Sequence, residues 1–502
     1  MVNMRIKIPG LRLKAMDDRI CIIGGGPAGL ACGVYLEKNG YNNYTIFERL
    51  NKVGGKAYSP KIDVNGEKRS YETGAIMGAI TYHAVSEMEA FGNYYHKGPD
   101  FKPGEPNMRR EYRSVSGKDA GKVIEPFNPK ANFSIKKTMG LIKLKKHFKK
   151  LAELMETKYW GYDCYGHIGV ADGKYFGISK LVKGMDNTPD GKHFPNYLKG
   201  VNPNLKDLAL PFKEFCELNG VEEVQRIWIG PYTSFGYGYF DEIPAAYVLK
   251  YLDMTTAKEF VGLRLWTWQD GTQEIYNSVN RNLLHPAVLE TEVVRIVRKN
   301  GFVYVTVKGA DGRERTEEFD RLIVTTPLDY FKDYADATED EKYLFSRIVH
   351  EKYVDFIARF DEGQGPVISG YMFENMEPEK LGHAMVYYHR WEDLKENCPC
   401  TVYALRNHTG DPDVPYDKTL ALMKYDIEKV LGFPIKEVLY AQESYYCPHV
   451  APKDYADGWY DKLEQIQGKN KTCFAGEILS FGDMEDTCAA SKDIVGRFFP
   501  DK

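Results

Sequence analysis

The chain has 502 residues, of which 43% are hydrophobic and 27% charged, so it is long enough for one large lobed body or two to three domains. Its net charge of -4 gives no support for nucleic-acid binding as the main activity, and no segment reaches the roughly eighteen apolar residues that span a bilayer. The nine cysteines are scattered and odd in number, which favours a reducing, cytoplasmic compartment.

The first predicted elements surround a glycine-rich turn. An apolar strand is expected at 19–23 and a helix from Pro27, and between them and in the first helical turn lie Gly24, Gly26, Ala28 and Gly29. In such a turn the first glycine permits a tight bend, the second lets backbone amides approach a pyrophosphate, and the third lets the helix pack on the strand. The helix N-terminus adds partial positive charge toward the phosphates. The pattern predicts a dinucleotide site.

Glu48 follows a second predicted strand at 44–47, where an acidic side chain binds ribose hydroxyls. A glycine turn without a nucleotide is the alternative, and Glu48 at this distance weakens it. The run from Glu48 continues with Arg49, Gly54, Gly55 and Lys56. It resembles the two-glycine loop that flavin amine oxidase-like proteins place over the pyrophosphate, and this resemblance favours FAD, bound non-covalently, over NAD.

The next predicted elements are short strands and a turn at 57–71, followed by a small-residue loop at 72–78. We expect Gly74, Ala75 and Ile76 of this loop to pass close to the cofactor, although glycines between elements are also ordinary turn residues. A basic amphipathic helix is expected at 134–156, a loop-rich insertion at 161–208, and further helix at 211–228.

Six aromatic residues fall within 228–240, and two tryptophans within 265–272. Aromatic runs are usually core, but the first run also contains three glycines, which let a ligand or a backbone approach closely. We interpret the two runs as walls of an apolar cavity beside the flavin. The only close cysteine pair, Cys398 and Cys400, has no second pair or histidine at ligand spacing. We interpret it as part of a loop and expect no metal site.

Strands at 302–307, 321–325 and 471–476, then a helix at about 486–499, complete the predicted elements. Nucleotide elements therefore occur in three separated pieces. The expected fold is α/β, with a discontinuous Rossmann-like FAD-binding domain, a mixed-sheet substrate domain and a helical cap domain. The expected boundaries are 17–60, 285–330 and 470–500 for the first, 61–130 and 331–465 for the second, and 131–284 for the cap, with an insertion near 165–205.

This layout resembles the flavin amine oxidase superfamily. The resemblance implies that Glu477, after Gly476, reaches the flavin ribityl chain and that Val293 holds the adenine through its backbone. The runs at 232–253, 265–272, 382–391 and 475–482 resemble more specifically the bacterial polyenoic fatty acid isomerases, which are FAD-dependent linoleate isomerases. The match covers most of the chain and departs in the N-terminal stretch, the basic segment at 134–150 and the insertion.

The isomerase resemblance implies roles for individual residues. Arg110 is expected to hold the substrate carboxylate at a tunnel entrance, Phe260 to form an aromatic gate beside it, and Phe235 to face the reacting carbons. Tyr232 and Trp268 are expected to contact the substrate, and Trp268 also the cofactor. From the residues alone, the alternatives are an arginine paired with Glu111 and ordinary core aromatics.

The implied reaction is an internal redox cycle. A hydride passes from the doubly allylic carbon to flavin N5 and returns to a different carbon, so that a polyunsaturated fatty acid such as linoleate becomes conjugated. Protein residues supply position, dryness and cation-stabilising rings. One alternative is a flavin oxidase or desaturase with net substrate oxidation; another is a flavin-bound lipid-binding protein without turnover.

The basic helix expected at 134–154 carries seven lysines that alternate with apolar side chains. It could be a solvated basic face, but a cationic amphipathic helix also binds anionic headgroups. We expect peripheral association with an anionic membrane surface through this segment.

Overall fold

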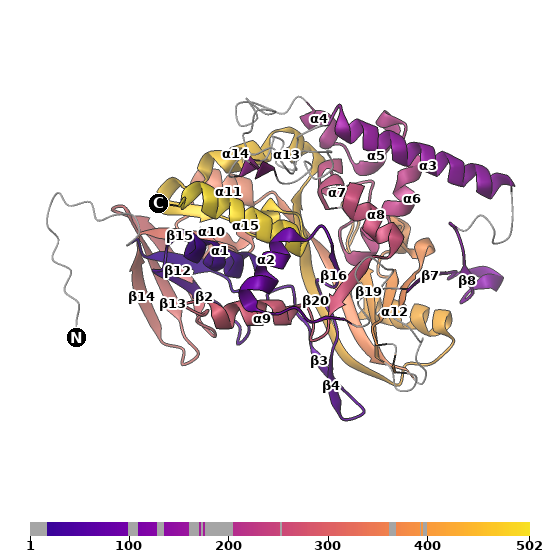
Figure 1. Ribbon diagram of the computed structural model, residues 1–502, viewed down its shortest axis with the longest axis horizontal. Coiled ribbons are helices and arrows are strands. Elements are labelled where there is room, and N and C mark those ends of the chain that lie inside the picture. The colour runs from indigo at the N-terminus through magenta and orange to yellow at the C-terminus, as the bar shows by residue number, and fades with distance from the viewer. Residues whose placement is uncertain are drawn as a thin grey trace.

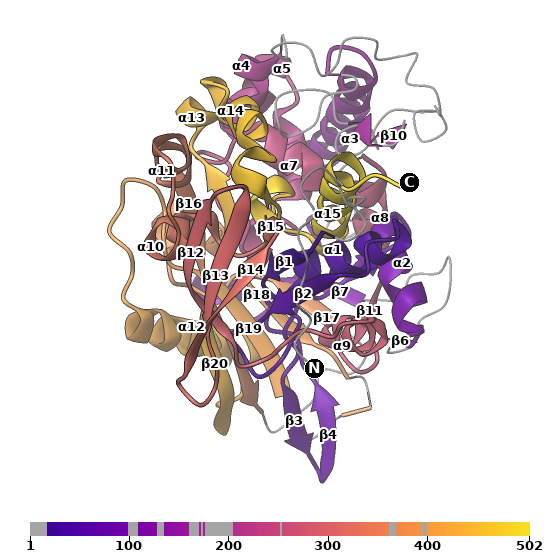
Figure 2. The same cartoon turned by 90° about the vertical axis from the view of Figure 1, so that its left-hand side faces the viewer.

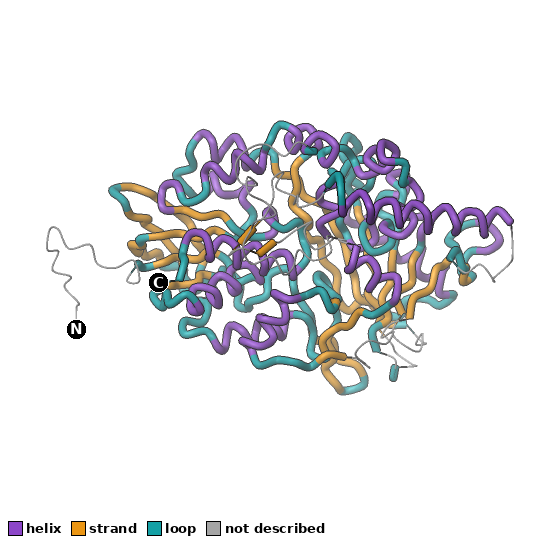
Figure 3. Tube along the Cα trace, turned by 45° about the horizontal axis from the view of Figure 1, so that its top comes forward, coloured by secondary structure: helices purple, strands orange, loops and turns teal. Residues whose placement is uncertain are grey.

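The computed structural model describes residues 18–98, 109–127, 135–159, 170–171, 174–175, 204–251, 254–360, 368–391, 393–394 and 399–501. Strands gather in two groups toward opposite ends of the molecule, and helices lie between them and along one long edge (Figure 3). Most of the predicted insertion at 161–208 lies outside the described residues.

Four parallel strands form the first sheet, in the order β2-β1-β15-β21. They are β2 (Tyr44–Phe47), β1 (Ile20–Ile23), β15 (Arg321–Val324) and β21 (Thr472–Phe474). Every residue of β1 is buried, as expected for a parallel strand covered on both faces. Helix α1 (Pro27–Lys38) packs on β1 and β2 and against α15 (Met484–Phe498). Because this sheet joins three separated segments, the predicted discontinuous Rossmann-like architecture is confirmed, while its exact boundaries stay a prediction.

An antiparallel sheet of β12 (Glu292–Lys299), β13 (Phe302–Lys308) and β14 (Glu314–Phe319) lies at the same end of the molecule (Figure 1). The remaining helices of this half are α2 (His83–Gly92), α9 (Gln273–Asn282), α10 (Phe331–Tyr334), α11 (Glu339–Phe345), α13 (Pro452–Ala456) and α14 (Trp459–Ile466). Helices α2 and α9 pack on each other.

The larger sheet has the order β20-β16-β19-β18-β17-β7-β8, and β7 runs parallel to β17 while the other neighbours are antiparallel. Its strands are β20 (Glu437–Val450), β16 (Ile348–Arg359), β19 (Pro399–Leu405), β18 (Val386–His389), β17 (Ile368–Tyr371), β7 (Arg109–Arg113) and β8 (Val123–Ile124). Helix α12 (Tyr416–Leu431) packs on β16 and β19. The expected mixed sheet is confirmed. Cys400 lies within β19, so the loop prediction was wrong for this residue, because its neighbours pair with β16.

The other strands of the described residues form three small sheets. The hairpin of β3 (Lys61–Val64) and β4 (Glu67–Ser70) projects from the body (Figures 1 and 2). A short sheet pairs β11 (Leu265–Trp268) with β5 (Gly78–Ala79) and β6 (Lys97–Gly98), and β9 (Val170–Ala171) pairs with β10 (Lys174–Tyr175).

A group of helices covers the upper right of the view in Figure 1. They are α3 (Ile135–Glu156), α4 (Leu205–Leu208), α5 (Phe212–Asn219), α6 (Gln225–Trp228), α7 (Ala245–Tyr251) and α8 (Met254–Gly262). The helix predicted at 134–156 is confirmed as α3. The helix expected at 211–228 is interrupted at Gly220, which has a left-handed φ of 59° at the end of α5. Among the helices of the described ranges, none combines the length and apolarity needed to cross a bilayer.

Candidate functional site

The glycines of the first turn differ in what surrounds each of them. Gly24 has a φ of 104°, which L side chains rarely adopt. A Cβ on Gly29 would lie 1.9 Å from the carbonyl oxygen of Gly24, so only glycine lets α1 pack this closely. A Cβ on Gly26 would instead meet nothing nearer than the Gly55 Cα at 3.7 Å. A methyl group at Gly26 would therefore make only ordinary contact with the Gly55 backbone at the N-terminus of α1.

Glu48 ends β2 and organises the same turn. Its carboxylate accepts hydrogen bonds from the backbone N–H of Gly25 at 2.7 Å and of Leu50 at 2.8 Å. Only 8% of Glu48 is exposed, and a carboxylate has about four lone-pair sites, so it keeps capacity for a ribose hydroxyl. The backbone of Thr291 donates to the Glu48 carbonyl at 2.9 Å, which brings the start of β12 beside the turn.

Val293 lies on β12 near this contact. Val293 pairs with Val307 and Arg295 pairs with Thr306, so the register shift between them leaves Val294 outside the ladder, next to Val293. Ala28 is buried within α1, whereas Arg49 is exposed.

The two-glycine loop lies directly against the first turn. Gly54 donates its N–H to the Gly25 carbonyl at 2.9 Å, and Gly55 faces Gly26. A Cβ on Gly74 would lie 1.8 Å from the carbonyl oxygen of Lys56, so the 74–76 segment runs hard against this loop. These residues fit a dinucleotide, because Gly26 and Gly55 bring two backbone segments into contact at the N-terminus of α1 and neither carries a side chain that would cover it.

Lys56 and Glu477 are joined by an ion pair although they are far apart in the sequence. The second carboxylate oxygen of Glu477 accepts the backbone N–H of Cys447 at 3.1 Å. Both residues are predicted cofactor contacts, and both lie partly exposed beside the glycine loops.

A buried ion pair fixes the segment that leads to Gly74. Arg390 and Glu72 are both fully buried, and their side chains approach to 2.5 Å. Glu72 also accepts the Ser59 hydroxyl at 2.6 Å and the Thr272 N–H at 3.3 Å. Removing one partner of such a pair would leave an uncompensated buried charge, so the path of the 72–76 segment is strongly specified.

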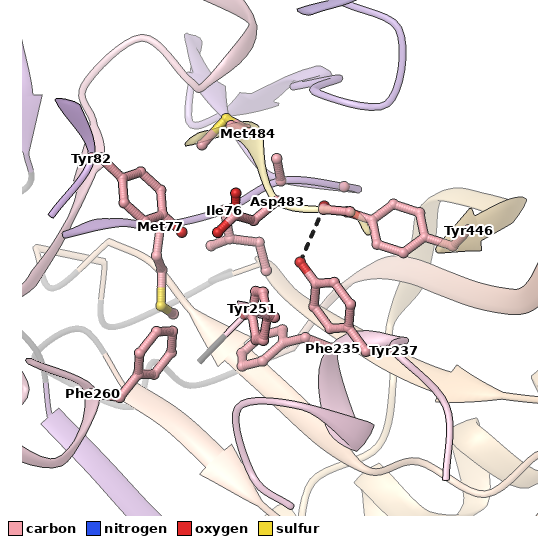
Figure 4. A pocket seen from close by; sticks show the side chains of 13 residues that line it. Ile76, Met77, Tyr82, Phe235, Tyr237, Tyr251, Phe260, Tyr446, Asp483 and Met484 are labelled. Atoms are coloured by element: carbon pink, nitrogen blue, oxygen red, sulfur yellow. Dashed lines mark hydrogen bonds between the residues drawn. The ribbon is translucent and has the colours of Figure 1, made fainter. Parts of the chain in front are cut away.

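One pocket connects these predicted cofactor residues with predicted substrate residues (Figure 4). Its empty space, including the part open to solvent, is about 440 Å³. The lining residues are Gly74, Ala75, Ile76, Met77, Tyr82, Phe235, Tyr237, Tyr251, Phe260, Tyr446, Gly482, Asp483 and Met484. The structure thus brings Phe235 and Phe260 together with Gly74–Ile76, as the sequence analysis expected.

The side chains that line the pocket are mostly aromatic or aliphatic, and Asp483 is the one carboxylate among them. Burial raises the pKa of Tyr237, Tyr251 and Tyr446 well above the ordinary value of 10, so these hydroxyls stay protonated. The Tyr237 hydroxyl donates to the carbonyl oxygen of Gly482 at 3.2 Å. Asp483 is the exception among the lining residues, and one of its oxygens caps α15 by accepting the Asp486 N–H at 2.6 Å.

Sequence reasoning missed most of the residues from distant segments, including Tyr446 and Asp483. For Asp483 a usable signal exists, because an Asp just before an amphipathic run is typical of a helix N-cap. The predicted helix began at about 486, whereas α15 begins at Met484.

Tyr232 and Trp268, also predicted to contact substrate, are fully buried and do not line this pocket. The Tyr232 ring packs against Tyr237 at 5.3 Å and Tyr251 at 5.8 Å, directly behind the pocket wall. The Trp268 indole N–H donates to Glu89 at 2.5 Å.

Arg110, which belongs to β7, lies beside Phe260 of α8. Its Nη1 donates to the Phe260 carbonyl oxygen at 3.4 Å, and its guanidinium lies 5.5 Å from the Tyr112 ring centroid. Glu111 pairs with Arg113 at 2.7 Å instead. No ion pair joins Arg110 to a carboxylate among the described residues, so its guanidinium has hydrogen-bonding capacity for an acidic ligand.

Comparison with known proteins adds an independent line of evidence. A family model described as an NAD(P)-binding Rossmann-like domain matches residues 22–95. The crystal structure of a CLA-producing fatty acid isomerase from P. acnes shares 40% sequence identity over 97% of this chain and 99% of that protein, with a TM-score of 0.79. The chain belongs to the fatty acid isomerase family. The resemblance expected from the aromatic runs is thereby confirmed.

More distant proteins share parts of the sequence or the fold of this isomerase-family chain. The polyenoic fatty acid isomerase of Ptilota filicina is 24% identical over 247 residues, which is 46% of this chain and 40% of that protein. A match to an uncharacterised protein of Acanthamoeba polyphaga mimivirus covers 66% of that protein. Cyclohexylamine oxidase from Brevibacterium oxydans shares the fold, with 15% identity and a TM-score of 0.60 over 96% of this chain and 98% of that protein.

Proposed function

We propose that this protein is an FAD-dependent isomerase that converts a non-conjugated polyunsaturated fatty acid, such as linoleate, into a conjugated one. The observation that supports this most directly is the pocket that joins the Gly74–Ile76 segment to Phe235 and Phe260, with the Arg110 guanidinium at the Phe260 backbone. Full-length similarity to a fatty acid isomerase supports the same substrate class.

The cofactor would be held by backbone rather than by a covalent bond. The amides around Gly26 and the N-terminus of α1 would bind the pyrophosphate, Glu48 the ribose, and the backbone of Val293, beside the register shift, the adenine. Bound FAD would supply the acceptance and return of a hydride.

The residues of this chain would position the acid and keep the site dry. Arg110 can bind a carboxylate through parallel hydrogen bonds and so fix how far a long acyl chain reaches. The Phe235 face would stabilise positive charge that develops on the acyl chain. The buried, protonated tyrosines present apolar ring surface and no charge, which excludes water from that chain.

We also propose that the protein associates peripherally with an anionic membrane surface through 134–154. The exposed lysines of α3 support this proposal.

Anaerobic incubation of the flavin-loaded protein with linoleate tests the function. The expected result is absorbance of a conjugated diene without oxygen uptake or peroxide release. Peroxide formed in equal amount with product would favour the oxidase or desaturase alternative. Binding of linoleate without any diene would favour the lipid-binding alternative.

A further inference from the structure

Helix α3 presents an outward face that combines aliphatic and basic side chains. Met139 and Ile142 are 65% and 64% exposed. Ile142, Lys145, Lys146 and Lys149 follow the spacing i, i+3, i+4 and i+7, so they share one face of the helix. Among the residues that the structure describes, no carboxylate forms an ion pair with Lys145, Lys146 or Lys149. This face is therefore both basic and apolar.

Strand β8 lies at the same end of the molecule as the first turn of α3 (Figure 1). Val123 is 51% exposed and Ile124 is 36% exposed. The Lys137 ammonium donates to the Glu125 carbonyl oxygen at 2.6 Å, which ties the residue after β8 to the first turn of α3. The acidic side chains Asp119 and Glu223 nearby are each paired with a lysine, at 2.8 and 3.2 Å.

A line of aromatic rings connects β8 with the pocket. Ile124 pairs in register with Tyr112, whose ring lies 5.9 Å from that of Tyr371. The Tyr371 ring in turn lies 6.3 Å from Phe235, which lines the pocket. Arg110 lies over Tyr112 on the same strand. Packed aromatic side chains thus link the exposed strand to the candidate site, beside the guanidinium that would hold a carboxylate.

We propose that α3 and β8 form a lipid-docking face, which binds an anionic bilayer surface and from which the acyl chain is drawn toward the pocket. The inference rests on the proposed isomerase function and names the surface that delivers its substrate. A bilayer interface offers what this face matches: anionic headgroups for the lysines and an apolar layer for Met139, Ile142 and the β8 side chains.

Co-sedimentation with phosphatidylcholine vesicles, with and without phosphatidylglycerol, tests the docking face. The triple variant Lys145→Gln, Lys146→Gln, Lys149→Gln should bind anionic vesicles about a hundredfold more weakly, since each lysine contributes about fivefold. The double variant Met139→Ser, Ile142→Ser should lose the part of binding that persists at high salt. The matched control Lys299→Gln, Lys308→Gln, Lys332→Gln removes the same charge from exposed positions at the opposite end of the molecule and should bind like the wild type.

Turnover separates docking from catalysis. Each docking variant should keep wild-type turnover of fatty acid dispersed in buffer and lose turnover of fatty acid embedded in anionic vesicles. Equal sedimentation of the wild type and the triple variant would overturn the docking face. The same conclusion would follow if the wild type bound vesicles without phosphatidylglycerol as strongly as vesicles that contain it. Absence of turnover by the wild type on dispersed fatty acid would instead defeat the isomerase function, whatever the vesicles show.

Discussion

Replacing Gly26 with valine separates cofactor binding from folding. Gly26 precedes α1 with a φ of -78° and a ψ of -177°, an extended conformation that valine adopts readily. A Cβ there has only ordinary contact with Gly55, at 3.7 Å, so the protein without cofactor should accommodate the substitution. The two methyl groups would however add bulk beside the N-terminus of α1, where the pyrophosphate is proposed to bind.

The size of each effect follows from this geometry. Glycine is a better helix N-cap than valine, and the loss should be about 1 kcal/mol or less, which lowers the melting temperature by only a few degrees. Bound cofactor at about 100 times its Kd stabilises a protein by about 2.7 kcal/mol, and the variant should lose this gain entirely. Gly29→Ala should behave differently, because its Cβ would lie 1.9 Å from a backbone oxygen and disrupt the turn itself.

The assay is the ratio of flavin absorbance to protein after purification, with thermal melts in the presence and absence of added FAD. Gly26→Val should purify folded and colourless, and its melting temperature should not respond to FAD. Gly309→Val, in the turn between β13 and β14, serves as control and should keep full flavin. If Gly26→Val carries as much flavin as the wild type, the assignment of the pyrophosphate site is wrong.

Three further substitutions test other parts of the site and the core. Arg110→Ala should weaken binding of free fatty acids by about 1.5 to 3 kcal/mol, the range for a hydrogen bond to a charged group, and leave methyl esters little affected; equal losses for both would mean that Arg110 acts structurally. Phe235→Leu should lower the rate of diene formation about tenfold by removing a ring face, whereas an unchanged rate would exclude a cation-stabilising role. Burial, with Glu242 nearby, raises the pKa of Glu351 well above 4.5, so the folded protein retains a proton that the unfolded chain releases, and stability falls as pH rises through that raised pKa. Glu351→Gln should therefore melt higher than the wild type near neutral pH, with a difference that vanishes toward pH 4.5, and melting curves showing the same difference at every pH would contradict this.

The elements that the sequence predicts well are those whose signals are local. The strand, glycine turn and helix at 20–38 depend on contacts within one supersecondary unit, such as that between Gly29 and Gly24. The role of Gly74 depends on Lys56, which is close to it only because the chain doubles back through the β3–β4 hairpin. The sequence indicates a small-residue loop there, and the folded chain explains why glycine is required at position 74.

The glycines of the 228–240 run show how one pattern can serve another purpose than a ligand contact. A Cβ on Gly236 would lie 2.7 Å from the Tyr353 ring, and a Cβ on Gly238 would lie 2.6 Å from the Glu351 carboxylate. The absence of a Cβ at both glycines therefore makes room for side chains of β16 and not for a ligand. Tyr237, between them, does line the pocket. The run therefore forms a cavity wall, and its glycines let that wall pack tightly on the sheet behind it.

Tyr232 and Phe235 illustrate what a linear pattern cannot distinguish. They are three residues apart and chemically similar, yet Phe235 lines the pocket while Tyr232 is fully buried behind it. The chain between them forms a single tight turn and not a regular helix or strand, so no period assigns a direction to either ring. Their directions are determined by long-range packing, with Tyr232 against Phe481 from the C-terminal segment and Phe235 against Tyr371 and Tyr403 of the large sheet. The chemistry a residue can perform is thus readable from its type, whereas its access to the substrate depends on which distant segments pack around it.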